Sequence, residues 1–98
     1  MKQTVTMTGY MGKPWEVTGD VQAGLILHKM GRTWCLSHIG SGCGIGAGAK
    51  LQKDVKARRA ALFDVLADWT APDLAGLAEA AGFEDLTGFA RKIRDVAY

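Results

Sequence analysis

Cysteine is scarce in this 98-residue chain, and acidic residues are missing from a long internal stretch. The two cysteines, Cys35 and Cys43, are too few for a disulfide framework and are expected to be small, buried apolar side chains. No aspartate or glutamate occurs from residue 21 to residue 53, so no nearby carboxylate is available there to orient a histidine. This absence argues against acid–base catalysis in that stretch.

Long hydrophobic runs are also missing. No apolar run follows Lys2, although a signal peptide requires one, and the uncharged stretch 33–49 is glycine-rich and shorter than a bilayer span. Apolar residues make up 48% of the sequence and charged residues 22%, which is ordinary for a soluble globular domain. The sequence therefore predicts a cytoplasmic protein in which residues 1–98 form a single domain.

The net charge of +2 conceals an uneven distribution. Residues 1–59 carry nine Lys and Arg against three Asp and Glu, whereas residues 60–98 carry three against seven. The basic half is suited to phosphates or to an acidic protein surface, and the acidic half argues against DNA wrapped around the whole molecule.

The first half of the chain shows the alternation that is typical of strands. Strands are expected at residues 3–8, 15–18, 21–28 and 33–39, with a turn at Gly19–Asp20. A two-residue hairpin at Met30–Gly31 would pair Leu27 with Trp34 and Leu25 with Leu36, which gives one continuous apolar face.

The second half shows helical periodicity. A long helix is expected at 50–68, with Leu51 on its apolar stripe, followed by helices at 71–81 and 85–97. Thr70 can cap the second helix, and Gly82 ends it. Leu86, Phe89 and Ile93 are expected on the buried face of the third. The predicted class is α+β, an antiparallel meander of three to five strands within residues 3–48, covered by these helices. The predicted core comprises Leu25, Leu27, Trp34, Leu36, Leu62, Leu66 and Trp69.

Five glycines stand at every second position from Gly40 to Gly48. They match neither a phosphate-binding Walker loop nor a dinucleotide fingerprint, because Gly48-Ala49-Lys50-Leu51 lacks the Gly-Lys-Ser/Thr sequence and no parallel βαβ unit precedes it. An anion site remains the weaker alternative. The preferred interpretation is a strand with one bare face, against which another element packs closely.

Histidine, cysteine and serine side chains around this stretch invite a metal or nucleophile interpretation. Cys35 and His38 lie three apart on an expected strand and point to opposite faces, so they do not converge on zinc with His28 and Cys43. Ser37, Ser41 and His38 are close in sequence, but neither a nucleophile elbow nor an orienting acid accompanies them. We therefore expect no metal, no cofactor and no enzymatic activity.

Basic residues cluster around the start of the long helix and the hairpin tip. The predicted partner-binding set is Lys29, Arg32, Lys50, Lys53, Lys56 and Arg59. A solvated polar face is the plain alternative for the lysines, and Arg58, within the apolar stripe, is expected to extend over the sheet edge or to pair with a carboxylate. The functional interpretation is a patch that meets phosphates or an acidic protein surface.

Residues 73–93 resemble the second half of an AraC-type helix-turn-helix, in which Ala-x-x-x-Gly-Phe precedes a helix bearing Phe-x-Arg-x-hydrophobic. The matching residues are Ala78, Gly82, Phe83, Phe89, Arg91 and Ile93. The resemblance implies a nucleic-acid-binding regulator, which would also use the basic helix. Glu84 and Asp85 depart from this role, because carboxylates at the start of a reading helix repel phosphates.

In size and style, the chain resembles small stand-alone proteins of phages and mobile elements, including anti-CRISPR inhibitors, a likeness that rests on no specific residue. It implies a non-enzymatic inhibitor that docks on a nucleic-acid-handling protein complex and blocks it. That function is the one we expect, with the nucleic-acid-binding regulator as the alternative.

Overall fold

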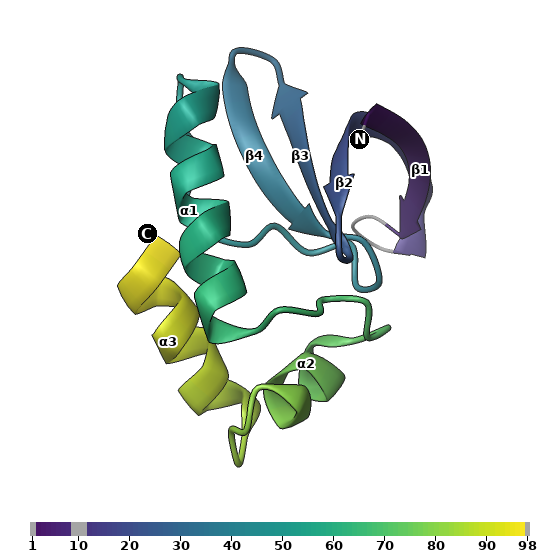
Figure 1. Ribbon diagram of the computed structural model, residues 1–98. Helices are drawn as coiled ribbons and strands as arrows, with labels where there is room; N and C mark the ends of the chain where they lie inside the picture. The colour runs from purple at the N-terminus through teal and green to yellow at the C-terminus, as the bar shows by residue number, and fades with distance from the viewer. Residues whose placement is uncertain (1, 9–11, 98) are drawn as a thin grey trace.

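Four antiparallel strands precede three helices along the chain, which confirms the predicted α+β class with its meander and C-terminal helices (Figure 1). The computed structural model describes residues 2–8 and 12–97. The strands are β1 (Lys2–Thr8), β2 (Pro14–Gln22), β3 (Leu25–Met30) and β4 (Thr33–His38). The helices are α1 (Gln52–Val65), α2 (Leu74–Ala80) and α3 (Leu86–Ala97). The sheet order is β1-β2-β3-β4, so each strand pairs with its neighbour in sequence.

The first turn differs from the prediction. The expected turn at Gly19–Asp20 is wrong, because both residues lie inside β2 and the chain turns at Ala23–Gly24 instead. Both of these residues have positive φ angles, 48° and 93°, as a two-residue type I′ hairpin requires. The expected single strand at 21–28 is therefore two strands joined by this turn.

The second hairpin turns one residue later than expected, at Gly31–Arg32. Leu27 consequently lies opposite Leu36, and Lys29 lies opposite Trp34. The shift of register is even, so the side chains stay on their predicted faces although their partners change.

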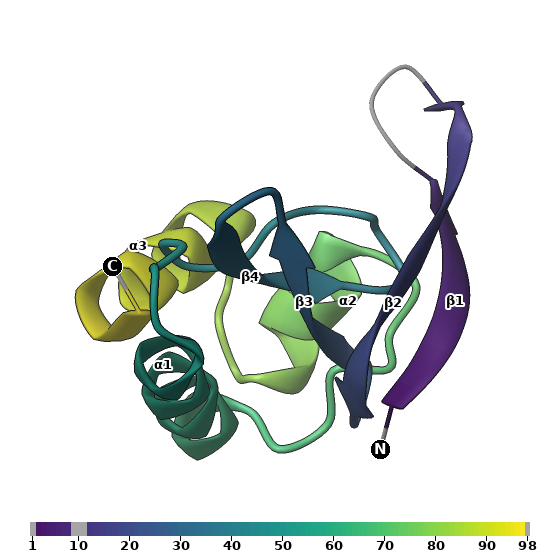
Figure 2. The same ribbon diagram turned by 90° about the horizontal axis from the view of Figure 1, so that it is seen from above.

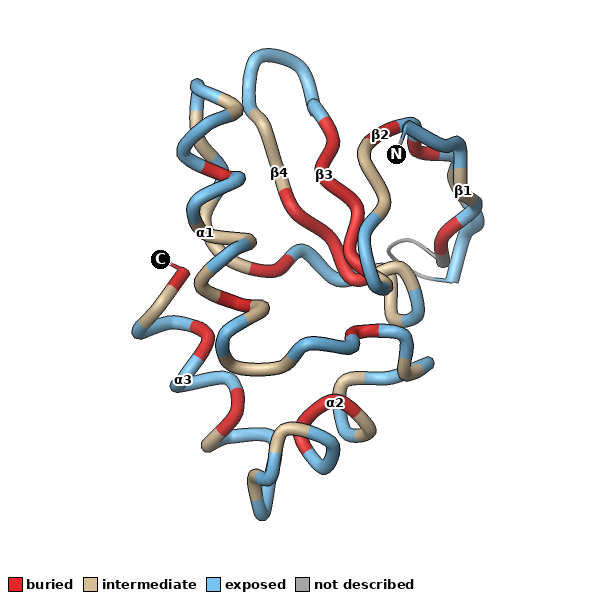
Figure 3. Tube along the Cα trace, in the orientation of Figure 1, coloured by how far each residue is buried: buried red, intermediate tan, exposed pale blue. Residues whose placement is uncertain are grey.

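The main core lies between one face of the sheet and the helices, all of which stand on the same side of the β3–β4 hairpin (Figures 1 and 2). Five of the seven predicted core residues are buried, and Trp34 and Leu66 are partly buried against them. Buried positions occur in β3, in β4 and along each helix (Figure 3). The buried cluster comprises Leu25, Leu27, Leu36, Ile45, Val55, Leu62, Trp69, Leu77, Ala78, Phe89, Ile93 and Ala97.

A smaller apolar cluster lies on the opposite face of the sheet. Met7, Val17 and Ile26 are buried there, and Trp15 packs against them. In β1 and β2 these residues alternate with polar ones, because Val5 pairs with Val17 and Met7 pairs with Trp15 on the same face. The β1–β2 hairpin therefore covers the side of β3 that the helices leave open (Figure 2).

The glycine-rich segment that follows β4 is not a regular strand, which corrects the prediction. It runs back along β4 and makes isolated bridges from Gly44 to Ser37 and from Ala49 to Trp34. The expectation of close packing holds at Gly40, where an added Cβ would lie 2.6 Å from the Ala71 carbonyl oxygen, and fails at Gly44, which has open space. The segment covers the outer edge of β4 without a continuous ladder.

Several helix ends also differ from expectation. Leu51 and Leu86 are exposed rather than buried. Thr70 does not cap the second helix; the Asp73 carboxylate does, accepting a hydrogen bond from the Gly76 N–H. Gly82 follows the C-cap of α2 with φ of 85°, as predicted. Within the described residues, none of these helices has the length and apolar character of a membrane span.

Candidate binding groove

A groove of about 550 Å³ lies between the N-terminal half of α1 and the helix-facing side of the sheet. Helix α1 contributes Gln52 and Lys56, one turn apart on the side turned to the sheet. The residues from the strands are Lys2, Thr18, Gly19, Asp20, Leu27, Lys29 and Trp34. Three lysines and one aspartate thus surround a partly apolar floor.

Lys29 and Trp34 form the centre of the groove wall. They lie opposite each other on β3 and β4, and the Lys29 Nζ stands 5.5 Å from the centroid of the Trp34 ring. Attraction between an ammonium and an aromatic face contributes about 0.5–1 kcal/mol at such exposed sites. This contact orients the Lys29 charge over the groove.

An ion pair joins the two walls of the groove. The Arg59 Nη1 on α1 donates to the Asp20 Oδ2 on β2 at 2.6 Å, and the Arg59 side chain is only 12% exposed. The pair fixes α1 against β2 and neutralises the one carboxylate that lines the groove. The charge that remains at the groove is therefore that of the lysines.

The structure brings together two of the six predicted contact residues. Lys29 and Lys56 line the groove, and Arg59 lies beside it, engaged with Asp20. The other three, Arg32, Lys50 and Lys53, are exposed but do not line it.

Two of the groove residues that the sequence did not predict, Trp34 and Asp20, were missed for identifiable reasons. Trp34 was assigned wholly to the core, but it is only partly buried. Its pairing with Lys29 follows from the observed register, so this pair could have been predicted if the turn had been placed at Gly31–Arg32. The approach of Asp20 to Arg59 joins positions 39 residues apart, and no sequence pattern signals it.

Arg58 has a structural role. Its Nη1 donates to the carbonyl oxygens of Ala47 and Gly48, at 2.7 and 3.2 Å. The side chain thus reaches over the sheet edge, where it holds the glycine-rich segment rather than a carboxylate.

Both buried histidines form hydrogen bonds to serines. On the face away from the helices, His28 Nε2 lies 2.8 Å from Ser37 Oγ, and both residues are buried. At the end of β4, His38 bonds to Ser41 through Nδ1 and donates from Nε2 to the Ala71 carbonyl oxygen. Among the described residues, the partners of both imidazoles are hydroxyls and backbone groups, and none is a carboxylate.

Cys35 is partly buried and Cys43 is exposed, which corrects the expectation that both are buried. In the part of the chain that the structure describes, no three histidine, cysteine or carboxylate side chains gather where they could hold a metal ion. No family model, curated protein or solved structure matches this chain. The function must therefore be argued from the groove and the surfaces themselves.

The burial of His28 makes stability depend on pH. Burial lowers the pKa of His28 below its ordinary value of 6.5, so the unfolded chain binds this proton more readily than the folded one. The stability that the buried His28 contributes is fully present above pH 6.5, and it is lost as the pH falls below that value. We expect the free energy of unfolding, measured by urea titration, to fall on acidification across this window, by at most about 1.4 kcal/mol per pH unit for one proton.

The matched variant is His28→Gln, which keeps a hydrogen-bonding group near Ser37 without a titrating ring. The slope between pH 7.5 and 5.5 should be smaller in this variant than in the unmodified protein. An equal slope in both proteins would show that other groups cause it.

Proposed function

We propose that this chain is a small non-enzymatic binding protein that docks through the groove between α1 and the sheet onto an acidic surface of another protein. The observation that carries the proposal is the convergence of Lys2, Lys29 and Lys56 on one groove from three separate elements. None of the three forms an ion pair with a described residue. Their charge is therefore available to a partner.

The arrangement favours carboxylates presented by a protein over a nucleic-acid strand. Base stacking requires an open aromatic face, and the Lys29 ammonium stands over the Trp34 ring. The groove also includes apolar surface from Leu27, which suits a mixed protein surface better than a row of phosphates. Complementary charge of this kind speeds association and selects the partner.

The proposed partner is a protein component of a nucleic-acid-handling complex, which the protein would block as an inhibitor. This narrower statement rests on the resemblance in size and style to small phage and mobile-element proteins. The groove supports it only through its charge, because nucleic-acid-handling proteins are one class among those that present acidic surfaces.

Reversing the groove charges tests the proposal. A glutamate-rich peptide carrying one aromatic residue, titrated into ¹⁵N-labelled protein, should shift the amide signals of Lys29, Trp34 and Lys56. The Kd should rise at least about tenfold in Lys29→Glu/Lys56→Glu, because two attractive contacts become repulsive. The unmodified protein should also bind more weakly as salt rises.

The control is Lys13→Glu/Lys92→Glu, which makes the same change in net charge at exposed positions that do not line the groove. It should retain the peptide affinity to within about twofold, as distant surface charges are screened. Oligothymidine and a DNA duplex form two further arms. Stronger binding of either nucleic acid at the groove, or a duplex shift abolished by Arg91→Glu/Arg94→Glu, would contradict the proposal and support the regulator alternative.

A further inference from the structure

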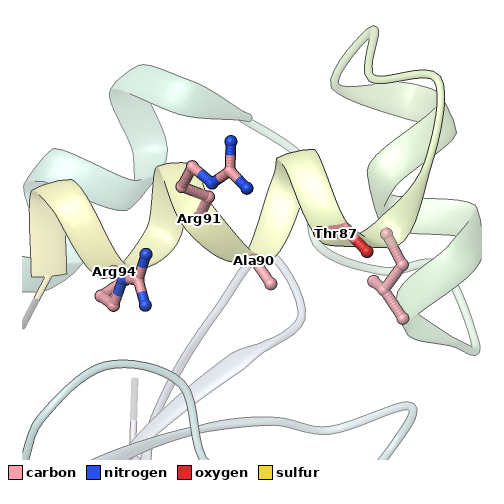
Figure 4. A pocket seen from close by; sticks show the side chains of 5 residues that line it. Thr87, Ala90, Arg91 and Arg94 are labelled. Atoms are coloured by element: carbon pink, nitrogen blue, oxygen red, sulfur yellow. The ribbon is translucent and has the colours of Figure 1, made fainter.

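Helix α3 exposes one large apolar side chain that its amphipathic pattern does not explain. Phe89, Ile93 and Ala97 are buried against the core, whereas Leu86 is 43% exposed. A shallow groove of about 630 Å³ runs along the outer side of the helix (Figure 4). Its lining residues are Leu86, Thr87, Ala90, Arg91 and Arg94.

Leu86 lies where three hollows meet. Besides the groove on α3, it borders an apolar hollow of about 310 Å³ between the glycine-rich segment, α2 and α3. That hollow is lined by Cys43, Gly44, Ile45, Leu74, Leu86, Phe89, Ala90 and Ile93. Leu86 also borders a hollow at the α2–α3 corner, and Glu79, Glu84 and Asp85 are among the residues that line it.

The surface is thus ordered along the helix. Carboxylates stand at its N-terminal end together with Leu86, the small Ala90 follows about one turn later, and Arg91 and Arg94 come after Ala90. Neither arginine forms an ion pair with a described residue, and the same is true of Glu79 and Glu84. The charges at both ends are therefore available to an outside partner.

A surface with this order is complementary to itself. If a second copy lies antiparallel along α3, the arginines of each chain face the carboxylates of the other. The two Leu86 side chains then approach the apolar hollows, and the small Ala90 in the middle allows the helices to come close. Two-fold pairing repeats each contact, as an isologous interface requires.

We infer that α3 is the interface of a homodimer, in which a second copy of this chain pairs antiparallel to it. The inference does not depend on the proposed function, because the lysine groove belongs to α1 and the sheet and shares no lining residue with the α3 surface. The interface uses Leu86 as its apolar anchor and the four end charges to set its direction.

Sedimentation equilibrium over a wide range of protein concentration tests the inference. The unmodified chain should pass from the mass of one chain to that of two. Arg91→Glu/Arg94→Glu should raise the dimer Kd by about a hundredfold, because carboxylates then face carboxylates. The α1 control Lys53→Glu/Lys56→Glu, with the same change in net charge, should dimerise like the unmodified chain.

A mixing experiment makes the test specific for this geometry. The variant Glu79→Arg/Glu84→Arg has basic end charges apart from Asp85, and Arg91→Glu/Arg94→Glu has only acidic ones. Each should be monomeric alone, and an equimolar mixture should form a heterodimer that is lost when both partners also carry Leu86→Ser. Asp85 is left unchanged, since its carboxylate accepts the Gly88 N–H at the start of α3.

A readout without substitutions completes the test. In a sample of mixed isotope labelling, the Leu86 methyl groups should show contacts to α3 of the other copy. An unmodified chain that keeps the mass of one chain at every concentration would overturn the inference. So would a dimer that the arginine reversals leave intact, or one whose contacts between copies lie away from α3.

Discussion

Gly24→Ala is expected to destabilise the protein by about 3 kcal/mol or more, a large part of the roughly 5–15 kcal/mol that holds a domain of this size together. A Cβ at this position would run into the backbone carbonyl of Trp69, which cannot move aside as a flexible side chain can. The φ of 93° adds strain for any residue that carries a Cβ. Urea denaturation followed by tryptophan fluorescence measures the loss.

The contact matters because the Ala23–Gly24 turn joins the sheet to the segment after α1. The Trp69 N–H donates to the Ala23 carbonyl oxygen at 2.8 Å, and the Ile39 N–H donates to that of Gly24 at 3.0 Å. Trp69 itself is fully buried, and its ring packs against Phe89 of α3. Displacing the turn therefore disturbs the sheet, the core and α3 together.

Gly82→Ala is the matched control. Gly82 has a similar φ of 85°, but an added Cβ there meets no atom within 4 Å. Gly82→Ala should lower the free energy of unfolding by only about 1 kcal/mol, because it adds backbone strain at a positive φ and no close contact. Equal losses in the two variants would show that close packing on Trp69 contributes nothing beyond backbone strain.

The sequence predicted the fold class because its periodicity changes from that of strands in the first half to that of helices in the second. Two-residue alternation in β1 and a helical stripe with Val55 and Leu62 are local signals, and both appear in the structure as expected. The Ala23–Gly24 turn was missed because alanine rarely adopts positive φ. The turn is explained by tertiary contacts, namely the hydrogen bonds that Trp69 and Ile39 donate to its carbonyl oxygens.

The glycine-rich segment shows a different limit. Alternation of small residues with Cys43, Ile45 and Ala47 matches a strand, but alternation does not fix where backbone hydrogen bonds go. In the structure the Ala47 N–H donates to the Ala97 carbonyl oxygen, and Arg58 binds the Ala47 carbonyl oxygen. These partners lie 50 and 11 residues away, beyond the reach of a local pattern.

Some of the residues of the candidate groove could be predicted from the sequence. Lys29 and Lys56 stood out as basic residues on a hairpin and a helix, and the structure places both at one groove. Their separation from Lys50 and Lys53 depends on the rotation of α1 against the sheet, which the ion pair between Arg59 and Asp20 helps to fix. The number and positions of charges in the sequence do not determine the rotation of α1. The sequence therefore predicted a basic patch that is broader than the groove.

His38→Leu is expected to cost about 3 kcal/mol, although leucine fits the apolar surroundings. His38 is fully buried and links the end of β4 to the segment before α2. The Ala71 carbonyl oxygen only accepts, so Nε2 carries the ring proton, and Nδ1 accepts from the Ser41 N–H at 3.2 Å. This is the pattern of a neutral imidazole with its proton on Nε2.

Leucine would leave the Ala71 carbonyl oxygen and the Ser41 N–H without their partner, at about 1–3 kcal/mol for each group that stays buried. Ser41→Ala removes the hydroxyl contact to His38 at 2.7 Å and the hydrogen bond that the Cys43 N–H donates to Ser41 Oγ at 3.2 Å, and it should cost about 1 kcal/mol. Urea denaturation of both variants and of the double variant gives the coupling between the two side chains. If His38 acts as this link, the double variant should lose less than the sum of the single losses, because the contact between the hydroxyl and the imidazole is counted in both single variants and only the Cys43 N–H bond remains for Ser41→Ala to remove. A loss below about 0.5 kcal/mol in His38→Leu, the size of an ordinary surface substitution, would mean that water replaces the imidazole at this junction.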